Sequence, residues 1–237
     1  MQRYFARKDG ISLSEEDQFH LTKVMRAQIG DTFELVNQEY VFVMKIDQTH
    51  PLSYHEIEKR EKKESAYSIT LYHCLPKGDK FELVLQKATE LGVHKIVGLI
   101  SSRTIVRLDE KDREKKSIRY QKILKEASEQ SHRDSIPLWG GIHDFSFISE
   151  HDEAIAWIAD EDEAGTTHSF YQQLINVDKK PQSIAILVGA EGGFSREEVF
   201  FAKQHGFIPV SLGKRILRSE TAAIASLAIL SFFLERD

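Results

Sequence analysis

The chain has 237 residues, a formal net charge of −5, and apolar and charged fractions that are ordinary for a folded protein. This length allows one large domain or two modest ones, and the composition excludes a collagen-like repeat or a long disordered tail. Cys74 is the only cysteine, which excludes an internal disulfide and a cysteine-rich zinc site.

The first 70 residues predict a small β-rich module. A short helix is expected after Ser14, which can cap it, with Phe19, Val24 and Met25 as its apolar positions. The charged run Glu56–Glu64 is expected to be a solvated turn or edge. Runs of β-branched and aromatic residues indicate strands at Tyr4–Phe5, Thr32–Val36, Tyr40–Ile46 and Tyr67–Cys74. We place the domain boundary near residue 72, which gives domains 1–71 and 72–237.

From there the pattern alternates between strand and helix. Such alternation predicts an α/β layer around a mostly parallel sheet, with Cys74 as a buried structural thiol in its first strand. Strands are predicted at Ser68–Leu75, Lys95–Ser101, Ala154–Ala159, Ser183–Gly189 and Phe207–Leu212. Helices are predicted at Lys80–Leu91, Glu114–Arg133, Ser195–His205 and Ser219–Leu234.

Two segments bear on membranes and on charged partners. The N-terminus is too polar for a signal peptide, and the apolar run Thr221–Leu234 is shorter than the ~20 residues of a bilayer span. We therefore expect no membrane association and interpret this run as a buried helix, suited to a subunit interface. Residues 71–140 hold 14 Lys and Arg against 10 Asp and Glu, so a basic region lies within an acidic protein. It fits either a solvated helix face or a phosphate-binding surface.

Unusual loops follow two of the predicted strands. Gly189–Phe194 holds three glycines, and Leu212–Thr221 leads into the last helix. In open α/β sheets, ligands collect at the carboxyl ends of the strands. The first loop has neither the GxGxxG pattern nor the lysine of a P-loop, so it does not predict a phosphate cradle. Taken alone, it is also compatible with an ordinary glycine-rich turn.

Together the two loops carry a family resemblance. The sequence Gly-x-Glu-Gly-Gly-Phe, followed about 20 residues later by Leu-Gly-x-x-Ile-Leu-Arg-x-Glu-Thr-Ala, resembles the SPOUT methyltransferases and, within them, the ribosomal RNA small-subunit methyltransferase E (RsmE) family. Further matching segments are Met1–Phe5, His20–Arg26, Gly30-Asp31, Lys87–Val93, Glu126–Arg133 and Ile136-Pro137. The family usually has Pro where this chain has Ala190 and often Thr where it has Ser219. Ala190 frees a backbone angle that proline would fix, which would loosen the loop and weaken cofactor binding, but it removes no functional group and is not expected to change the reaction.

The resemblance implies a fold, an activity and partners. The fold is a trefoil-knotted, mostly parallel α/β sheet with helices on both faces, preceded by a PUA-like RNA-binding β-barrel. The activity is methylation of uracil N3 of a specific uridine in 16S rRNA of the small ribosomal subunit, with S-adenosylmethionine as methyl donor and no metal. A cytoplasmic homodimer is expected, with each site completed at the subunit interface.

The resemblance also suggests roles for individual residues. Arg218 is expected to stabilise the uracil oxyanion, and Glu220 or Glu129 to accept the N3 proton. The cofactor is expected to contact Leu187, Gly189, Gly193, Leu212, Gly213, Ile216 and Leu217. Expected RNA contacts are Arg3, Arg7, His20, Arg26, Lys77 and Arg133.

Each proposed catalytic role has a structural alternative. Arg218 could hold a phosphate, Glu220 could serve the dipole of the last helix, and Glu129 could pair with Arg133. The acidic run Asp160–Glu163 lacks the spacing of a calcium loop and is expected to be a solvated loop.

Two other functions compete with rRNA base methylation. One is a SPOUT methyltransferase acting on a tRNA base or a ribose hydroxyl. The other is a non-catalytic RNA-binding assembly factor, which would not need the cofactor.

Overall fold

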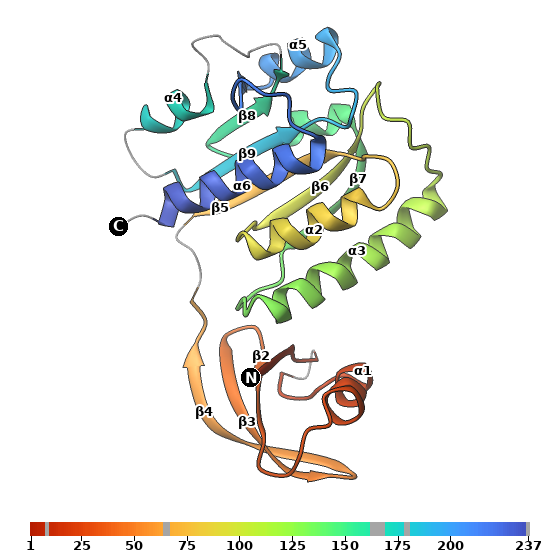
Figure 1. Cartoon of the computed structure of the whole chain (residues 1–237), viewed down its shortest axis with the longest axis vertical. Coiled ribbons are helices and arrows are strands. Elements are labelled where there is room, and N and C mark those ends of the chain that lie inside the picture. The colour runs from red at the N-terminus through yellow and green to blue at the C-terminus, as the bar shows by residue number, and fades with distance from the viewer. Residues whose placement is uncertain (8–9, 64–66, 162–168, 178–180, 236–237) are drawn as a thin grey trace. The chain divides into compact units, whose positions relative to one another are not determined.

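A computed structural model describes residues 1–7, 10–63, 67–161, 169–177 and 181–235. The chain forms two compact units (Figure 1). The first comprises Met1–Glu64 together with Lys125–Ile136, and the second comprises Ser65–Leu124 and Pro137–Asp237. No single boundary in the sequence separates the two units, because Lys125–Ile136 belongs to the first unit although the second unit begins before it in the sequence.

The first unit is built on a four-stranded sheet in the order β1-β2-β3-β4. Its strands are β1 (Gln2–Phe5), β2 (Thr32–Val36), β3 (Tyr40–Thr49) and β4 (Leu52–Glu61). β1 pairs with β2 in parallel, and the other pairs are antiparallel. Much of the charged run predicted as a turn or edge belongs to β4, the edge strand of the sheet, and consecutive residues from His55 to Lys59 are exposed.

The short helix of the first unit is α1 (Glu15–Phe19), and it continues as a π-helix, η1 (His20–Val24). Ser14 caps it as predicted, accepting a hydrogen bond from the Asp17 amide at 3.1 Å. The predicted apolar face is wrong, because Phe19, Val24 and Met25 are exposed and Leu21 is buried instead. The π-helical turn changes the spacing at which side chains share a face, so the 3.6-residue period no longer applies.

Asp134 anchors the segment Lys125–Ile136 to the first unit. Its carboxylate accepts hydrogen bonds from Arg3 at 2.8 Å and from Arg60 at 2.7 Å, and from the Lys63 amide at 2.9 Å. Burial opposes ionisation, but these hydrogen bonds prevail and lower the pKa of Asp134 to about 2. Arg3 also binds Glu34 and is only 4% exposed. The prediction that Arg3 contacts RNA is therefore corrected, since its guanidinium is buried between two carboxylates.

The second unit contains a six-stranded sheet in which every strand pair is parallel, as predicted. The order is β10-β8-β9-β5-β6-β7. The strands are β5 (Ser68–Cys74), β6 (Lys95–Ile100), β7 (Leu138–Asp144), β8 (Ile155–Ala159), β9 (Ser183–Val188) and β10 (Phe207–Val210). β5 and β9 lie at its centre, which explains their nearly unbroken apolar sequences.

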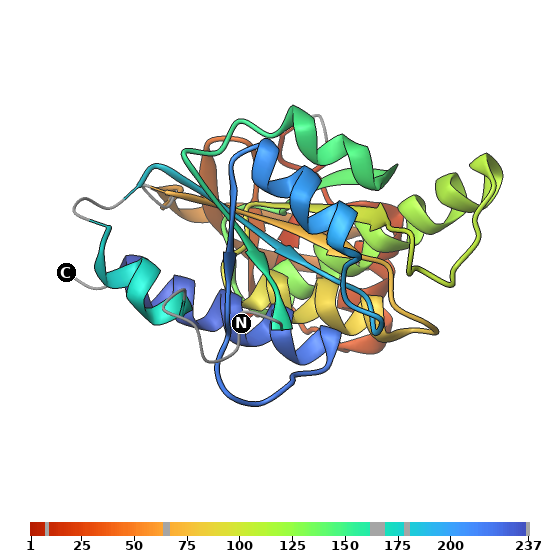
Figure 2. The same ribbon diagram turned by 90° about the horizontal axis from the view of Figure 1, so that it is seen from above.

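Helices cover both faces of this sheet (Figure 2). On β9, Ile184 and Ile186 face one core, while Ala185 and Leu187 face the other. The first core is closed by α2 (Lys80–Glu90), α3 (Glu110–Gln130), α4 (Phe170–Ile175) and α6 (Ser219–Glu235). The second is closed by α5 (Arg196–Gln204) and the 3₁₀ helix η2 (Phe145–Glu150).

Most elements of the second unit match their predicted ranges, but three had no clear sequence signal. β7, with two glycines in its middle, η2 and the six-residue α4 are too short or too irregular to show a period. The long helix α3 begins four residues earlier than predicted.

Cys74 is fully buried as expected, and burial raises the pKa of its thiol to about 12. In the described part of the chain, no helix is both long and apolar enough to span a bilayer.

Candidate active site

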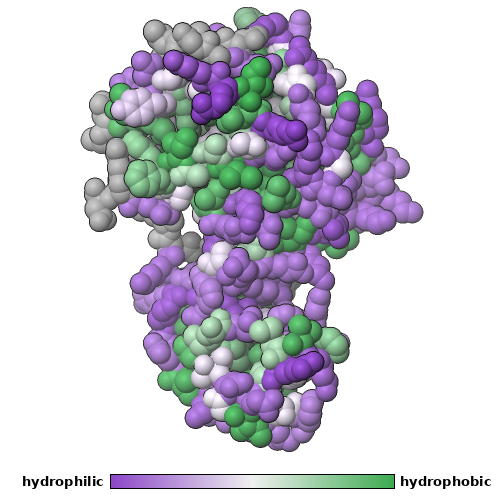
Figure 3. Space-filling model, in the orientation of Figure 1, coloured by the Kyte–Doolittle hydropathy of each residue, from purple (hydrophilic) through white to green (hydrophobic). Residues whose placement is uncertain are grey.

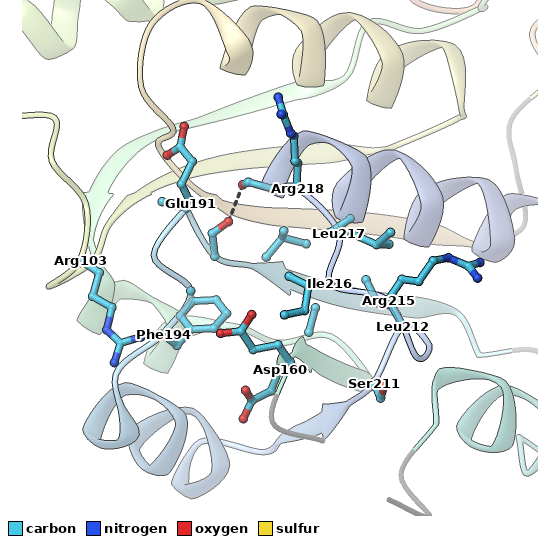
Figure 4. A pocket seen from close by; sticks show the side chains of 18 of the residues that line it. Arg103, Asp160, Glu191, Phe194, Ser211, Leu212, Arg215, Ile216, Leu217 and Arg218 are labelled. Carbon is cyan, nitrogen blue, oxygen red and sulfur yellow. Dashed lines mark hydrogen bonds between the residues drawn. The ribbon is translucent and has the colours of Figure 1, made fainter. Parts of the chain in front are cut away.

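A cavity of about 780 Å³ lies in the second unit at the carboxyl ends of β8, β9 and β10 (Figure 4). The loops that follow these strands form most of its wall, as expected for a parallel sheet. Lys80 at the start of α2, Arg103 after β6, Arg196 at the start of α5 and Ala222 of α6 also line the cavity. Of the predicted cofactor residues, the lining includes Gly189, Gly193, Leu212, Gly213, Ile216 and Leu217.

The glycine loop after β9 is tightly folded. A β-carbon on Gly189 would lie 3.1 Å from the Gly193 α-carbon, closer than real β-carbons normally pack. Gly193 itself has φ of 63°, a conformation that side chains disfavour, and its amide donates to the Ala190 carbonyl at 3.0 Å. The glycines therefore permit a compact turn that places backbone, rather than side chains, at the cavity wall.

The second loop supplies an apolar wall. Leu212, Ile216 and Leu217 come from the segment between β10 and α6 and gather opposite the Phe194 ring (Figure 4). Ile216 is 80% exposed, so the cavity keeps an apolar side chain in contact with water. A flat apolar ligand such as a purine base would cover it favourably.

Ser219 connects the two loops. Its buried hydroxyl donates a short hydrogen bond to the Gly189 carbonyl, drawn as the dashed line in Figure 4, and lies 3.2 Å from His73 Nε2. His73 Nδ1 lies 2.8 Å from the Cys74 carbonyl. Burial lowers the pKa of His73 to about 4, so the ring is neutral near neutral pH. This buried contact fixes the start of α6, and with it Arg218, against the glycine loop.

Arg218, Glu191 and Lys80 line the cavity, whereas Glu220, two positions after Arg218, is not among the lining residues. The Arg218 side chain is exposed and forms no ion pair with any described carboxylate. Glu191 accepts a hydrogen bond from Lys80 Nζ at 2.9 Å. Burial opposes ionisation of the Glu191 carboxyl, but this hydrogen bond and the charge of Lys80 prevail and lower its pKa. Glu220 Oε2 is buried, lies 3.9 Å from Lys80 Nζ and has no hydrogen-bond partner among the described residues.

The acidic run after β8 is not simply a solvated loop. Asp160 is 9% exposed, and both Asp160 and Glu161 line the cavity, so that prediction is corrected for these two residues. Its other members, 162 and 163, lie outside the described residues. The run directly follows β8 of the parallel sheet, and this position in the sequence was the signal that could have predicted a role in ligand binding.

Two predicted site residues lie elsewhere. Leu187 is fully buried in the core on the α5 side of β9 and does not line the cavity; its neighbour Val188 does. The alternation of side chains along a strand explains this correction. Glu129 belongs to the first unit, where it pairs with Lys125 at 3.0 Å rather than with Arg133. Burial raises the pKa of Glu129 against the opposing effect of Lys125.

The predicted RNA contacts lie in different surroundings. Arg7, Arg26 and Lys77 are exposed, and Arg133 is half-buried. His20 Nδ1 lies 2.9 Å from the Tyr4 hydroxyl, which occupies one ring nitrogen. Among the described residues, no group of three His, Cys, Asp or Glu side chains has a metal-binding arrangement.

Comparisons with known proteins agree on one family. Residues 63–231 match the model of an RNA methyltransferase domain. The chain is 32% identical to ribosomal RNA small subunit methyltransferase E of Bacillus subtilis, over 99% of this chain and 98% of that protein. It is 31% identical, with a TM-score of 0.86, to a Legionella pneumophila methyltransferase solved with SAM bound, over 97% and 96% of the two chains. A ribosomal RNA small subunit methyltransferase E of Neisseria gonorrhoeae, solved with S-adenosyl methionine bound, is 28% identical to this chain with a TM-score of 0.82. The match covers 98% of this chain and 97% of that chain.

Proposed function

The chain belongs to the ribosomal RNA small subunit methyltransferase E family, and on that premise we propose that it methylates uracil N3 of one uridine in 16S rRNA. The observation that carries the proposal is the cavity at the ends of β8, β9 and β10, with Arg218 at its side. Relatives of 31% and 28% identity are solved with the methyl donor S-adenosylmethionine bound. The cavity has the volume and the apolar wall to hold the adenosine group of this cofactor.

The methyl donor is S-adenosylmethionine, whose sulfonium supplies an activated methyl group without a metal. The difficulty lies on the base, because uracil N3 carries a proton and must be unpaired to be reached. Arg218 stabilises the negative charge that develops on a uracil oxygen as that proton leaves. Its exposed guanidinium, without a carboxylate partner among the described residues, is available for this role.

Glu220 accepts the N3 proton. Its buried Oε2 lacks a hydrogen-bond partner among the described residues, an unusual state that functional sites often contain. Glu129, the other candidate, already pairs with Lys125 and lies near the Phe5 amide at 3.4 Å, so it is the weaker one within a single chain.

The finer architecture is part of the same proposal. The second unit, near the predicted domain 72–237, forms a trefoil knot from its two cavity loops, and the predicted domain 1–71 acts as a PUA-like RNA-binding barrel. Its RNA contacts are Arg7, His20 and Arg26, and Lys77 and Arg133 add contacts from the predicted domain 72–237. A homodimer is supported by α6, where Ile229 and Phe232 are 44% and 80% exposed. The face seen in Figure 3 carries patches of apolar surface on the second unit. An enzyme that modifies the small subunit would work in the cytoplasm.

The test uses small subunits and 16S rRNA from a strain that lacks this gene. Incubation with the purified protein and labelled S-adenosylmethionine should produce one N3-methyluridine in 16S rRNA, located by nuclease mapping and mass spectrometry. Methyl groups on tRNA or on a ribose would show the alternative specificity. Binding of rRNA without any transfer would show an assembly factor and refute the proposal.

A further inference from the structure

Six of the seven arginines of the second unit fall into two groups, and the seventh, Arg107, does not line the cavity. Arg113, Arg119 and Arg196 form ion pairs with Asp144, Glu82 and Asp160. Arg103, Arg215 and Arg218 line the cavity, as Arg196 does, but no described carboxylate lies within ion-pair distance of these three. All three are exposed. The cavity edge therefore carries guanidinium groups that form no direct ion pair with a described carboxylate, although Glu197 lies close enough to Arg103 to interact with its charge.

The methyl donor does not account for this charge. It carries two positive groups, a sulfonium and an ammonium, against a single carboxylate, so one cation suffices for it. The lining also holds Asp160 and Glu191, which pair with Arg196 and Lys80, and Glu161. The three guanidinium groups outside these pairs favour a ligand with several negative charges, and arginine matches phosphate in geometry as well as in charge. This edge of the cavity therefore fits a polyanionic second substrate better than it fits a second cofactor molecule.

The loop that carries Arg103 is held rigidly beside the glycine loop. Arg103 donates to the Gly192 carbonyl at 2.8 Å, and a β-carbon on Gly192 would lie 3.2 Å from the Arg103 β-carbon. Ser101 and Thr104 close a buried turn at the base of the loop, with 3.0 Å between their hydroxyls. Arg103 is therefore placed by backbone contacts rather than by a carboxylate, which leaves its charge available to a ligand.

Glu198 supplies a second anchor for this loop. It completes the capping box of α5, accepting from the Ser195 amide at 2.9 Å, and its other oxygen accepts from the Ser102 amide at 2.6 Å. One buried carboxylate thus fixes the start of α5 and the base of the Arg103 loop together.

The three arginines come from different places around the cavity. In Figure 4, Arg103 and Arg215 lie at opposite edges, and Arg218 lies on the side between them. We propose that Arg103 and Arg215 bind backbone phosphates on either side of the target nucleotide, so that the base enters the cavity beside Arg218. This inference rests on the proposed function and adds the path of the RNA chain across the site.

The experiment measures RNA binding as a function of salt for Arg103→Ala and Arg215→Ala in the full-length protein. The probe is a 16S rRNA transcript, in filter binding from 50 to 300 mM KCl. Each lost phosphate contact should lower the slope of log affinity against log salt by roughly 0.7–0.9 and weaken binding about three- to tenfold near 100 mM. The Kd for S-adenosylmethionine, measured by calorimetry, should stay within twofold.

Arg119→Ala is the matched control, because Arg119 is also exposed but is already paired with Glu82. It should leave the salt slope unchanged, whereas Arg103→Lys should recover most of the slope. An unchanged slope in both alanine variants, or a loss of cofactor affinity with normal RNA binding, would overturn the inference. If the alanine variants bound RNA normally while the wild type still methylated rRNA, the proposed function would stand. The proposed contacts of Arg103 and Arg215 with RNA phosphates would then be refuted.

Discussion

Replacing Ser219 with alanine tests how the two cavity loops are held together. The change removes a buried hydroxyl that donates to the Gly189 carbonyl, and the neutral His73 ring also loses its neighbour at 3.2 Å. A buried acceptor left without its donor costs about 1–3 kcal/mol. If the loops become disordered in the free variant, cofactor binding must order them again. A cost of about 1–2 kcal/mol for this ordering would raise the Kd for S-adenosylmethionine about 5- to 30-fold.

Ser226→Ala is the control for Ser219→Ala. Ser226 is a fully buried serine of the same helix, but its hydroxyl donates only to the Ala222 carbonyl of α6 at 2.7 Å. Calorimetry should show weaker cofactor binding for Ser219→Ala alone, and Ser219→Thr, which keeps the hydroxyl, should restore it. Thermal melts would confirm that each variant is folded. Equal cofactor affinity in both alanine variants would refute the reasoning, because the contact with Gly189 would then not shape the site.

Four further changes have defined outcomes. Arg218→Ala should lower kcat about 100- to 1000-fold while the melting temperature stays unchanged, since the side chain is exposed; wild-type turnover would remove its catalytic role. Gly193→Ala places a side chain at φ of 63° and should cost about 1–2 kcal/mol in thermal unfolding, with weaker cofactor binding measured by calorimetry. Phe232→Glu should yield monomers in sedimentation if α6 forms the dimer interface, and an unchanged dimer would exclude that face. Asp134→Asn should abolish a stability contribution that is complete above about pH 4 and lost as the pH falls towards the folded pKa of about 2, a difference that urea unfolding across this range would reveal.

Periodicity was sufficient for the long elements of the second unit. The apolar stripe of α2 and the capping box at Ser195 predicted helices that the structure contains, and the nearly continuous apolar sequence of β9 predicted a central strand. These signals are local, because each depends on residues within a few positions of one another. The same reasoning failed for Phe19 and its neighbours, where a π-helical turn changes the local period.

The order of residues along the chain indicated that two loops at strand ends would line one cavity, because the carboxyl ends of parallel strands lie at the same edge of the sheet. Only the tertiary structure decided which side chains reach that edge. It buried Leu187 in the opposite core, placed Asp160 in the cavity, and enclosed Arg3 between two carboxylates. These outcomes depend on pairing between residues far apart in sequence, such as Arg3 with Asp134, and no local pattern encodes such distances.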